Sequence, residues 1–253
     1  MALNAAFIGT LLPILEMVSR RPQNKTIEPV LASIGYPDMI SLNSSLTENQ
    51  RSSYKPFVDN NPLSMKWHGL NPNTHTSYSI TKICHSRGFF FRYFDINSGS
   101  GGESKGFTKI DLNYDIPSDL YASCDILIDS GTAEHCFNIG KVFENYFHLL
   151  RPNGILIQYI PFLSPNHGFW SINPTLIYDL TSCNPIKILK CELQSYADYS
   201  DYFSNDPKII PHSPTGRFNI QAAERDTQII LLFFIYKKLS KSIFTYPIQA
   251  KYR

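Results

Sequence analysis

The sequence predicts an α/β protein with a doubly wound, mostly parallel sheet of seven strands that ends in an antiparallel C-terminal edge. Short apolar runs alternate with segments of helical periodicity along most of the chain, which is the pattern of βαβ units. Aspartates directly follow several of these runs. The last two runs, 186–193 and 228–237, are expected to form the antiparallel edge.

The expected strands are, in chain order, 29–34, 89–94, 107–110, 125–128, 155–160, 186–193 and 228–237. Helices are expected at 5–18, at 76–85, at 139–150 and from Asn173 onward. Asn138 is the expected N-cap of the helix at 139–150, and Pro152-Asn153-Gly154 ends that helix. Asn173 and Pro174 supply a cap and a proline at the first helical position of the last helix.

The N-terminal segment 5–18 is apolar, but no basic residue precedes it and Glu16 interrupts it. It lacks the charged start of a signal peptide and is too short to span a bilayer. The apolar residues that recur at helical spacing are Phe7, Leu11, Leu12, Leu15 and Val18. We therefore expect an amphipathic helix that docks on the domain, and no membrane partner.

Length and composition indicate one domain, 1–253, with a sizeable core, because 43% of the 253 residues are hydrophobic. Charged residues make up 17% and the net charge is +2, which gives no electrostatic case for nucleic acid. The five cysteines contain no Cys-x-x-Cys pair, so reduced thiols in a cytoplasmic protein are expected. Because no His, Asp or Glu cluster has ligand spacing along the chain, no metal is expected.

Residues 41–73 form a polar, poorly patterned stretch. We interpret this stretch as an insertion or lid, because long loops in compact domains are usually functional or mobile. Its aromatic and imidazole side chains are Tyr54, Phe57, Trp67 and His68.

The candidate ligand-binding aspartates that follow expected strands are Asp38, Asp95, Asp111 and Asp129. Ligands of open α/β sheets bind at the carboxyl ends of the strands. An acid after the second strand can accept hydrogen bonds from both ribose hydroxyls of a nucleoside, which suits Asp95. An acid or amide after the third can meet an adenine amino group, which suits Asp111 or Asn113. One such aspartate usually serves only its turn, but three at successive strand ends favour a shared site.

Four motifs occur in order between residues 110 and 180. They are Asp111-Leu112-Asn113, the run from Asp129 to Asn138, the run from Leu149 to Gly154, and the run from Asn166 to Trp170. The series resembles the Rossmann-like class I S-adenosylmethionine-dependent methyltransferases. It is most similar to a bacterial branch with D-x-G-T-x-E-H-x-F-N and N-H-G-F-[YW] motifs.

This resemblance implies S-adenosyl-L-methionine as cofactor. By position, Asp95 matches the ribose acid of the family, and the adenine-side motif matches Asp111, Leu112 and Asn113. Gly35 and Asp38 stand in the place of the first motif, with one glycine where the family usually has Gly-x-Gly. The residues that would line the methionine side of the cofactor are Asp129, Ser130, Gly131 and Thr132.

The candidate catalytic residues are His167, His135 and Glu134. Methyl transfer to oxygen or nitrogen proceeds in line from a sulfonium, so the enzyme orients the acceptor and removes its proton. By the resemblance, Glu134 and His135 face cofactor and substrate, and His167 lies in the loop where substrate enters. An imidazole suits the role of base, although His135 can instead hydrogen-bond the backbone and hold its loop.

The expected function is therefore methylation of a small molecule or a sugar-containing precursor, with O-methylation preferred over N-methylation. The alternative is a catalytically degenerate binding protein of the same fold, which the single-glycine turn favours. A nicotinamide-dependent reductase would need a Gly-x-Gly-x-x-Gly turn after the first strand, and the sequence has none there.

Overall fold

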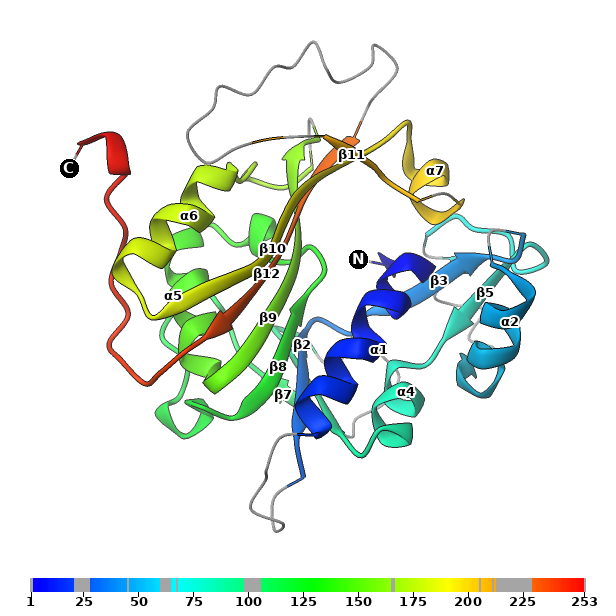
Figure 1. The fold of residues 1–253 in the computed structure, drawn as a ribbon, viewed down its shortest axis with the longest axis horizontal. Helices are drawn as coiled ribbons and strands as arrows, with labels where there is room; N and C mark the ends of the chain where they lie inside the picture. The colour runs from blue at the N-terminus through cyan, green and yellow to red at the C-terminus, as the bar shows by residue number, and fades with distance from the viewer. Residues whose placement is uncertain are drawn as a thin grey trace.

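The computed structural model describes residues 2–20, 28–44, 46–59, 65–66, 68–97, 106–164, 167–204, 206–210, 212 and 229–252. Its main sheet consists of β2 (Val30–Ile34), β6 (Phe90–Asp95), β7 (Phe107–Lys109), β8 (Cys124–Asp129), β9 (Leu150–Leu163), β10 (Ile186–Tyr196), β11 (Lys208–Ile210) and β12 (Ile229–Lys238). The strand order is β11-β10-β12-β9-β8-β2-β6-β7 (Figure 1). Trp67 and Asn166, named above, lie outside the described residues.

The neighbouring strands β7, β6, β2, β8 and β9 are parallel to one another. Strand β12 runs antiparallel to both β9 and β10. The prediction of a mostly parallel α/β sheet with an antiparallel C-terminal edge is confirmed, and the fold is Rossmann-like. The predicted number of seven strands is wrong, because β11 adds an eighth at the edge, antiparallel to β10. At three residues, β11 is too short to leave a periodic pattern in the sequence.

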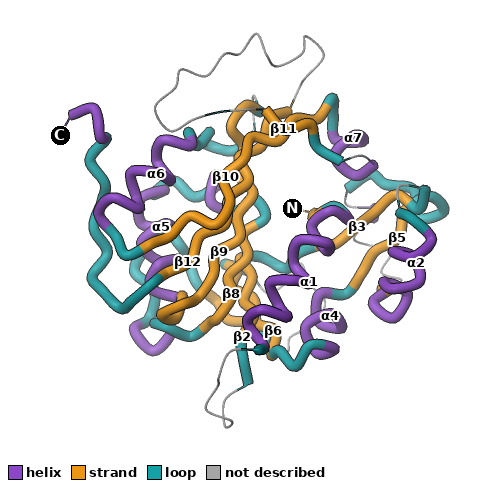
Figure 2. The backbone as a smooth tube through the Cα atoms, in the orientation of Figure 1, coloured by secondary structure: helices purple, strands orange, loops and turns teal. Residues whose placement is uncertain are grey.

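Helices cover both faces of this sheet (Figure 2). One face is covered by α5 (Ile139–Leu149) and α6 (Pro174–Cys183), and the other by α1 (Ala5–Ser19) and α4 (Ile80–Ser86). Alternate strand residues supply two separate cores: Leu31 belongs to the core with α1, and its neighbour Ala32 belongs to the core with α5. The sheet is therefore buried on both sides, as expected for parallel strands.

A second, four-stranded sheet has the order β1-β3-β5-β4. It is built from β1 (Ala2–Leu3), β3 (Asp38–Leu42), β4 (Val58–Asp59) and β5 (His75–Tyr78), with α2 (Glu48–Tyr54) and α7 (Tyr199–Ser204) nearby. Two of its strands, and α2, include residues of the segment 41–73. The predicted helix at 76–85 is partly wrong: 75–78 pair with β3, and the helix starts at Ile80, where Ser79 accepts a hydrogen bond from Lys82 N.

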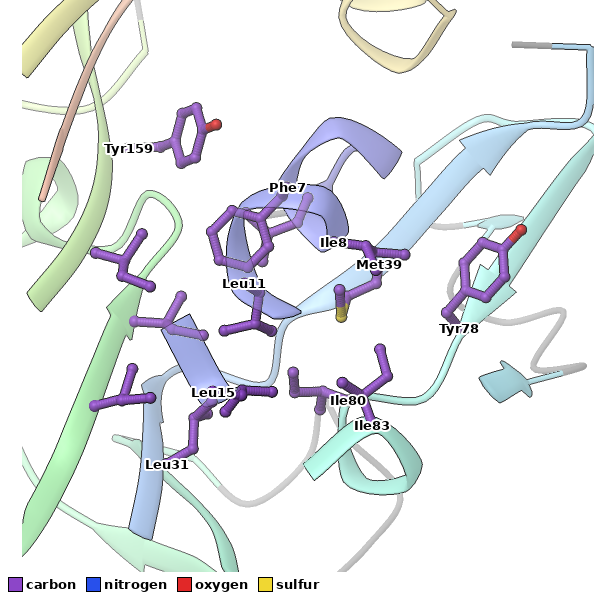
Figure 3. Packing of buried hydrophobic residues seen from close by; sticks show 14 of the residues in the cluster. Phe7, Ile8, Leu11, Leu15, Leu31, Met39, Tyr78, Ile80, Ile83 and Tyr159 are labelled. Atoms are coloured by element: carbon purple, nitrogen blue, oxygen red, sulfur yellow. The ribbon is translucent and has the colours of Figure 1, made fainter. Parts of the chain in front are cut away.

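The helix α1 lies between the two sheets (Figure 3). Phe7 and Leu11 point toward the main sheet. There the ring of Phe7 meets the ring of Tyr159 edge-on, with 6.0 Å between the ring centroids. Ile8 points toward Met39 of the second sheet, and all of these α1 side chains are fully buried. The predicted docked helix is confirmed, with Leu12 only partly buried. No helix within the described ranges is long and apolar enough to cross a membrane.

Candidate functional site

Three predicted site residues share one row at the carboxyl ends of neighbouring parallel strands. Ile34 of β2 is in register with Phe94 of β6 on one side and with Asp129 of β8 on the other. One residue further along each strand, the row consists of Gly35, Asp95 and Ser130. Gly35 N donates to Phe94 O at 2.7 Å and has a φ of 68°. This row borders the point where strand order reverses, the usual ligand position in such sheets.

The turn at Gly35 differs from a nucleotide-binding turn. After Gly35 the chain enters β3 rather than a helix, so this turn does not lead into the helix N-terminus that a nucleotide-binding turn provides. Asp38 is the first residue of β3, and its Oδ2 lies 3.0 Å from Nε2 of His68. Asp38 therefore belongs to a strand of the second sheet, and its carboxylate pairs with His68.

Asp95 and Asp111 follow β6 and β7, which are hydrogen-bonded neighbours. Asp95 is half-buried, and its Oδ1 accepts from Asn97 N at 3.2 Å. Asp111 is exposed, and its Oδ1 accepts from the backbone and side-chain nitrogens of Asn113, both at 2.9 Å. Asn113 in turn accepts from Asn138 N at 2.9 Å, which ties this turn to the start of α5.

Leu112, predicted beside the cofactor, is a core residue with only 4% of its surface exposed. Its side chain packs in the same core as α5. Its carbonyl accepts a hydrogen bond from Nδ2 of the buried Asn145. Leu112 thus anchors the turn between Asp111 and Asn113 to the core.

The carboxylate of Asp129 is fully buried and is surrounded by donors from the protein itself. Oδ1 accepts from the backbone of Gly131 and Thr132, at 3.0 and 2.8 Å. Oδ2 accepts from Ala133 N at 3.3 Å, Tyr146 Oη at 2.9 Å and Gln158 Nε2 at 2.7 Å. Burial raises the pKa of Asp129, and the donated hydrogen bonds oppose that rise. Its side chain therefore shapes the loop that follows β8.

The predicted catalytic residues Glu134, His135 and His167 lie together, and we call them the His-Glu cluster. Glu134 and His135 belong to a short 3₁₀ turn, Ala133–His135, whereas His167 follows β9. Oε1 of Glu134 lies 3.4 Å from Nε2 of His167 and 3.9 Å from Nε2 of His135. The Glu134 side chain is fully buried, and this burial raises its pKa, while His167 opposes the rise.

Two loops hold this cluster in place. Phe169 N donates to Glu134 O at 2.7 Å. Trp170 Nε1 donates to the carbonyls of Cys136 and Phe137, at 3.0 and 3.2 Å. The loop after β8 and the loop after β9 are therefore joined by two neighbouring residues that directly follow Gly168.

Exposed aromatic rings border the His-Glu cluster. Phe137 and Phe169 are 73% and 68% exposed and meet edge-on at 6.1 Å, and Phe137 lies 6.5 Å from Trp170. Such rings offer a face to a planar or sugar-like ligand. Phe169 and Trp170 flank a polar loop in the sequence, and Phe137 occupies the phenylalanine position of the motif that runs from Asp129 to Asn138.

The folded chain also brings together a candidate set of metal ligands that linear spacing does not predict. Glu134, His135 and His167 each offer a ligand atom, and these atoms lie within 4.8 Å of one another. Linear spacing does not show this cluster, because its third member comes from a different loop.

Known proteins provide the following comparisons. No model of a protein family matches this chain, and no curated protein sequence matches it. Among solved structures, the CMeT domain of the citrinin polyketide synthase aligns with 94% of this chain at 10% identity and a TM-score of 0.47. The DszA carbon methyltransferase aligns with 93% at 12% identity and a TM-score of 0.47.

A third structure is the Burkholderia thailandensis 1,6-didemethyltoxoflavin-N1-methyltransferase with bound 1,6-didemethyltoxoflavin and S-adenosylhomocysteine. It aligns with 92% of this chain and 81% of its own, at 10% identity and a TM-score of 0.39. The present chain spans about half the length of the first two structures, 53% and 54%. Because every one of these TM-scores is below 0.5, we base no functional conclusion on them.

Proposed function

We propose that this chain is an S-adenosylmethionine-dependent methyltransferase that acts on a small molecule or a sugar-containing precursor. The observation that carries the proposal is the row of Gly35, Asp95 and Ser130 across three neighbouring parallel strands. The row borders the reversal of strand order, where open α/β sheets bind nucleotides. Asp95 would accept hydrogen bonds from the two ribose hydroxyls of a nucleoside, and the neighbouring Gly35 has no side chain to block its approach.

The residues present fit such a cofactor in part. Asp95 and the exposed Asp111 supply carboxylate acceptors at adjacent strand ends, which suits ribose hydroxyls and an adenine amino group. Gly35 has open space around it, since a Cβ there would meet only Thr132 Oγ1, at 3.6 Å. Ser130, Gly131 and Thr132 would border the methionine side through their backbone, with Asp129 fixing the loop.

When bound, S-adenosyl-L-methionine would supply an electrophilic methyl group. His167 would take the proton of the acceptor, or His135 in its place, because both imidazoles lie at the carboxyl ends of the strands. The Glu134 carboxylate, 3.4 Å from His167, would stabilise the imidazolium that forms. The rings of Phe137 and Phe169 would orient the acceptor. A hydroxyl acceptor is favoured, since it must lose a proton that a base can take.

We further propose that the segment 41–73 borders the acceptor as an insertion. Its described part contributes to the second sheet, and His68 lies 6.2 Å, ring to ring, from Phe203 of α7. This contact links the segment to the region that follows β10.

A catalytically degenerate binding protein is the second candidate. It is favoured by the turn at Gly35, which leads into β3 instead of a helix, and by Asp38, which bonds His68. Binding of the demethylated cofactor without turnover of any acceptor in a broad panel would support this candidate.

Isothermal titration calorimetry of the full chain with S-adenosylmethionine and S-adenosylhomocysteine tests the proposal. We expect Asp95→Ala to weaken binding more than tenfold, because two ribose hydroxyls lose a charged acceptor. Asp119→Ala is the matched control, since Asp119 is an exposed aspartate in the 3₁₀ turn Ser118–Leu120. No binding up to the millimolar range would remove the proposal, and unchanged affinity of Asp95→Ala would remove Asp95 from it.

A further inference from the structure

The Glu134 carboxylate lacks the partners that a buried charge requires. Its side chain is fully buried. Within the part of the chain that the structure describes, neither oxygen has a hydrogen-bond donor in good geometry. The nearest imidazole nitrogen among the described residues, Nε2 of His167, is 3.4 Å away, which is long for a charge-assisted bond. Buried carboxylates are normally paired or bound to a metal, so this group points to a missing ligand.

We propose that Glu134, His135 and His167 form a mononuclear site for a zinc-type transition-metal ion. Two imidazoles and one carboxylate are a set that zinc and its neighbours prefer, whereas magnesium and calcium prefer oxygen ligands alone. The same His₂Glu combination holds catalytic zinc in other proteins. The inference goes beyond the proposed function and does not rest on it, because the metal is tested without cofactor or acceptor. An ion held by Nε2 of both histidines would exclude these nitrogens as the base of that function, so the titration below also distinguishes the two roles.

The distances come close to those that such an ion needs, since the three ligand atoms lie within 4.8 Å of one another. Zinc bonds of about 2.0–2.2 Å in a tetrahedron place the ligand atoms about 3.3–3.6 Å apart. The separation of 3.4 Å between Glu134 and His167 falls in this range. The separation of 3.9 Å between Glu134 and His135 is slightly larger. The His135 side chain is 50% exposed, so its ring is free to make the small rotation that closes this distance.

The surrounding loops hold the ligands as a preformed site requires. The hydrogen bond from Phe169 N to Glu134 O fixes the loop of His167 against the backbone of Glu134. Asp129 does not compete for the ion, because five donors already occupy its two oxygens. Three protein ligands leave a fourth position for water or a substrate, and the partial exposure of both histidines places that position toward solvent.

Titration of the full, chelator-treated chain with Co²⁺, followed by Zn²⁺, tests the site. We expect one Co²⁺ per chain with the visible absorption of a site with fewer than six ligands, displacement by Zn²⁺, and a higher Tm in Zn²⁺. His135→Ala and Glu134→Gln should each weaken Co²⁺ binding at least tenfold. His85→Ala, which removes an exposed histidine of α4, should leave the affinity unchanged.

Three results would overturn the proposal. The first two are no Co²⁺ binding up to the millimolar range, and equal affinity in the wild type and in His135→Ala. Because His135 is half exposed, that variant should keep the fold, and circular dichroism verifies this. The third is a sulfur-to-metal charge-transfer band, which would assign the ion to a cysteine such as the partly exposed Cys136.

Discussion

Gly168 lies against the backbone of Glu134 so closely that no side chain fits between them. A Cβ on Gly168 would lie 2.8 Å from Cγ and 2.9 Å from the carbonyl oxygen of Glu134, and the φ of Gly168 is 77°. The next residue, Phe169, donates its N–H to that same oxygen at 2.7 Å. One glycine therefore permits the contact between the two loops that carry the His-Glu cluster.

Gly168→Ala should displace the His167 loop and destabilise the protein by about 2–4 kcal/mol, from left-handed strain and overpacking together. Urea unfolding measures this loss. Gly88→Ala is the control, because Gly88 has a similar φ of 71° but no atom within 4 Å of its Cβ position. Gly88→Ala should lower the free energy of unfolding by only about 1–2 kcal/mol. Equal losses in the two variants would show that the contact with Glu134 adds nothing.

Trp170→Phe should loosen the same pair of loops without disturbing the core. The variant keeps a ring near Phe137 but loses the N–H that donates to the carbonyls of Cys136 and Phe137. We expect a stability loss of about 1 kcal/mol and about tenfold faster amide exchange at Phe169, a local opening. Hydrogen exchange followed by NMR measures both effects. Unchanged exchange at Phe169 would contradict the joining role of Trp170.

The elements that sequence reasoning predicts well depend on local interactions. Asn138 and Asn173 cap α5 and α6 as predicted, and their side chains accept from Lys141 N and Thr175 N. The strand that ends at Asp95 also agrees with the prediction to within one residue. Caps and apolar runs are local in the chain, so one sequence suffices to find them.

The features that sequence reasoning missed depend on contacts between distant segments. The second sheet joins the residues before α1 to those after β2, and its strands, of two to five residues, are too short to carry a strong period. Asp129 was predicted to line the methionine side of the cofactor, but Tyr146 of α5 and Gln158 of β9 donate to its carboxylate. Linear spacing does not reveal the proposed metal-ligand set, because His167 reaches Glu134 only in the folded chain.

Asp129→Asn should be strongly destabilising, by about 3 kcal/mol. In either orientation of the amide, its NH₂ group would face donors: Gly131 and Thr132 on one side, or Ala133, Tyr146 and Gln158 on the other. A buried donor against donors loses several hydrogen bonds at once. Urea unfolding measures the change.

Tyr146→Phe provides the graded comparison for the Asp129 site, since it removes a single donor, the hydroxyl 2.9 Å from Asp129 Oδ2. This substitution should lower the free energy of unfolding by about 1–2 kcal/mol. A loss from Asp129→Asn no larger than that from Tyr146→Phe would mean that the carboxylate is not the centre of this network.

Leu11→Ala should destabilise the whole protein, because α1 is packed between the two sheets. Leu11 is fully buried, and its truncation should cost about 2–5 kcal/mol. Met17→Ala on the same helix is the control, since Met17 is 47% exposed and should change stability by less than about 0.5 kcal/mol. Urea unfolding compares the two variants, and similar losses would refute the central position of α1.

Lys238 gives the protein a pH dependence that can be isolated by substitution. Its ammonium is buried over the ring of Phe147, at 4.1 Å, and donates to the carbonyls of Phe147 and Leu150 at 2.7 and 2.9 Å. Burial lowers its pKa to about 8, from 10.5 in an exposed lysine. Between these values the unfolded chain binds more protons than the folded chain, so this group makes stability rise with pH.

The penalty of the buried charge is therefore fully present below pH 8 and is relieved as the pH rises from about 8 to about 10.5. A neutral amine still has two hydrogens, which suffice for both carbonyls. Lys238→Met has no such titration, so the stability of the wild type relative to this variant should increase over that interval. Urea unfolding of both proteins at intervals from pH 7 to 10 measures the difference. A constant difference, or one that changes in favour of Lys238→Met, would show that the lysine is not desolvated in the folded protein.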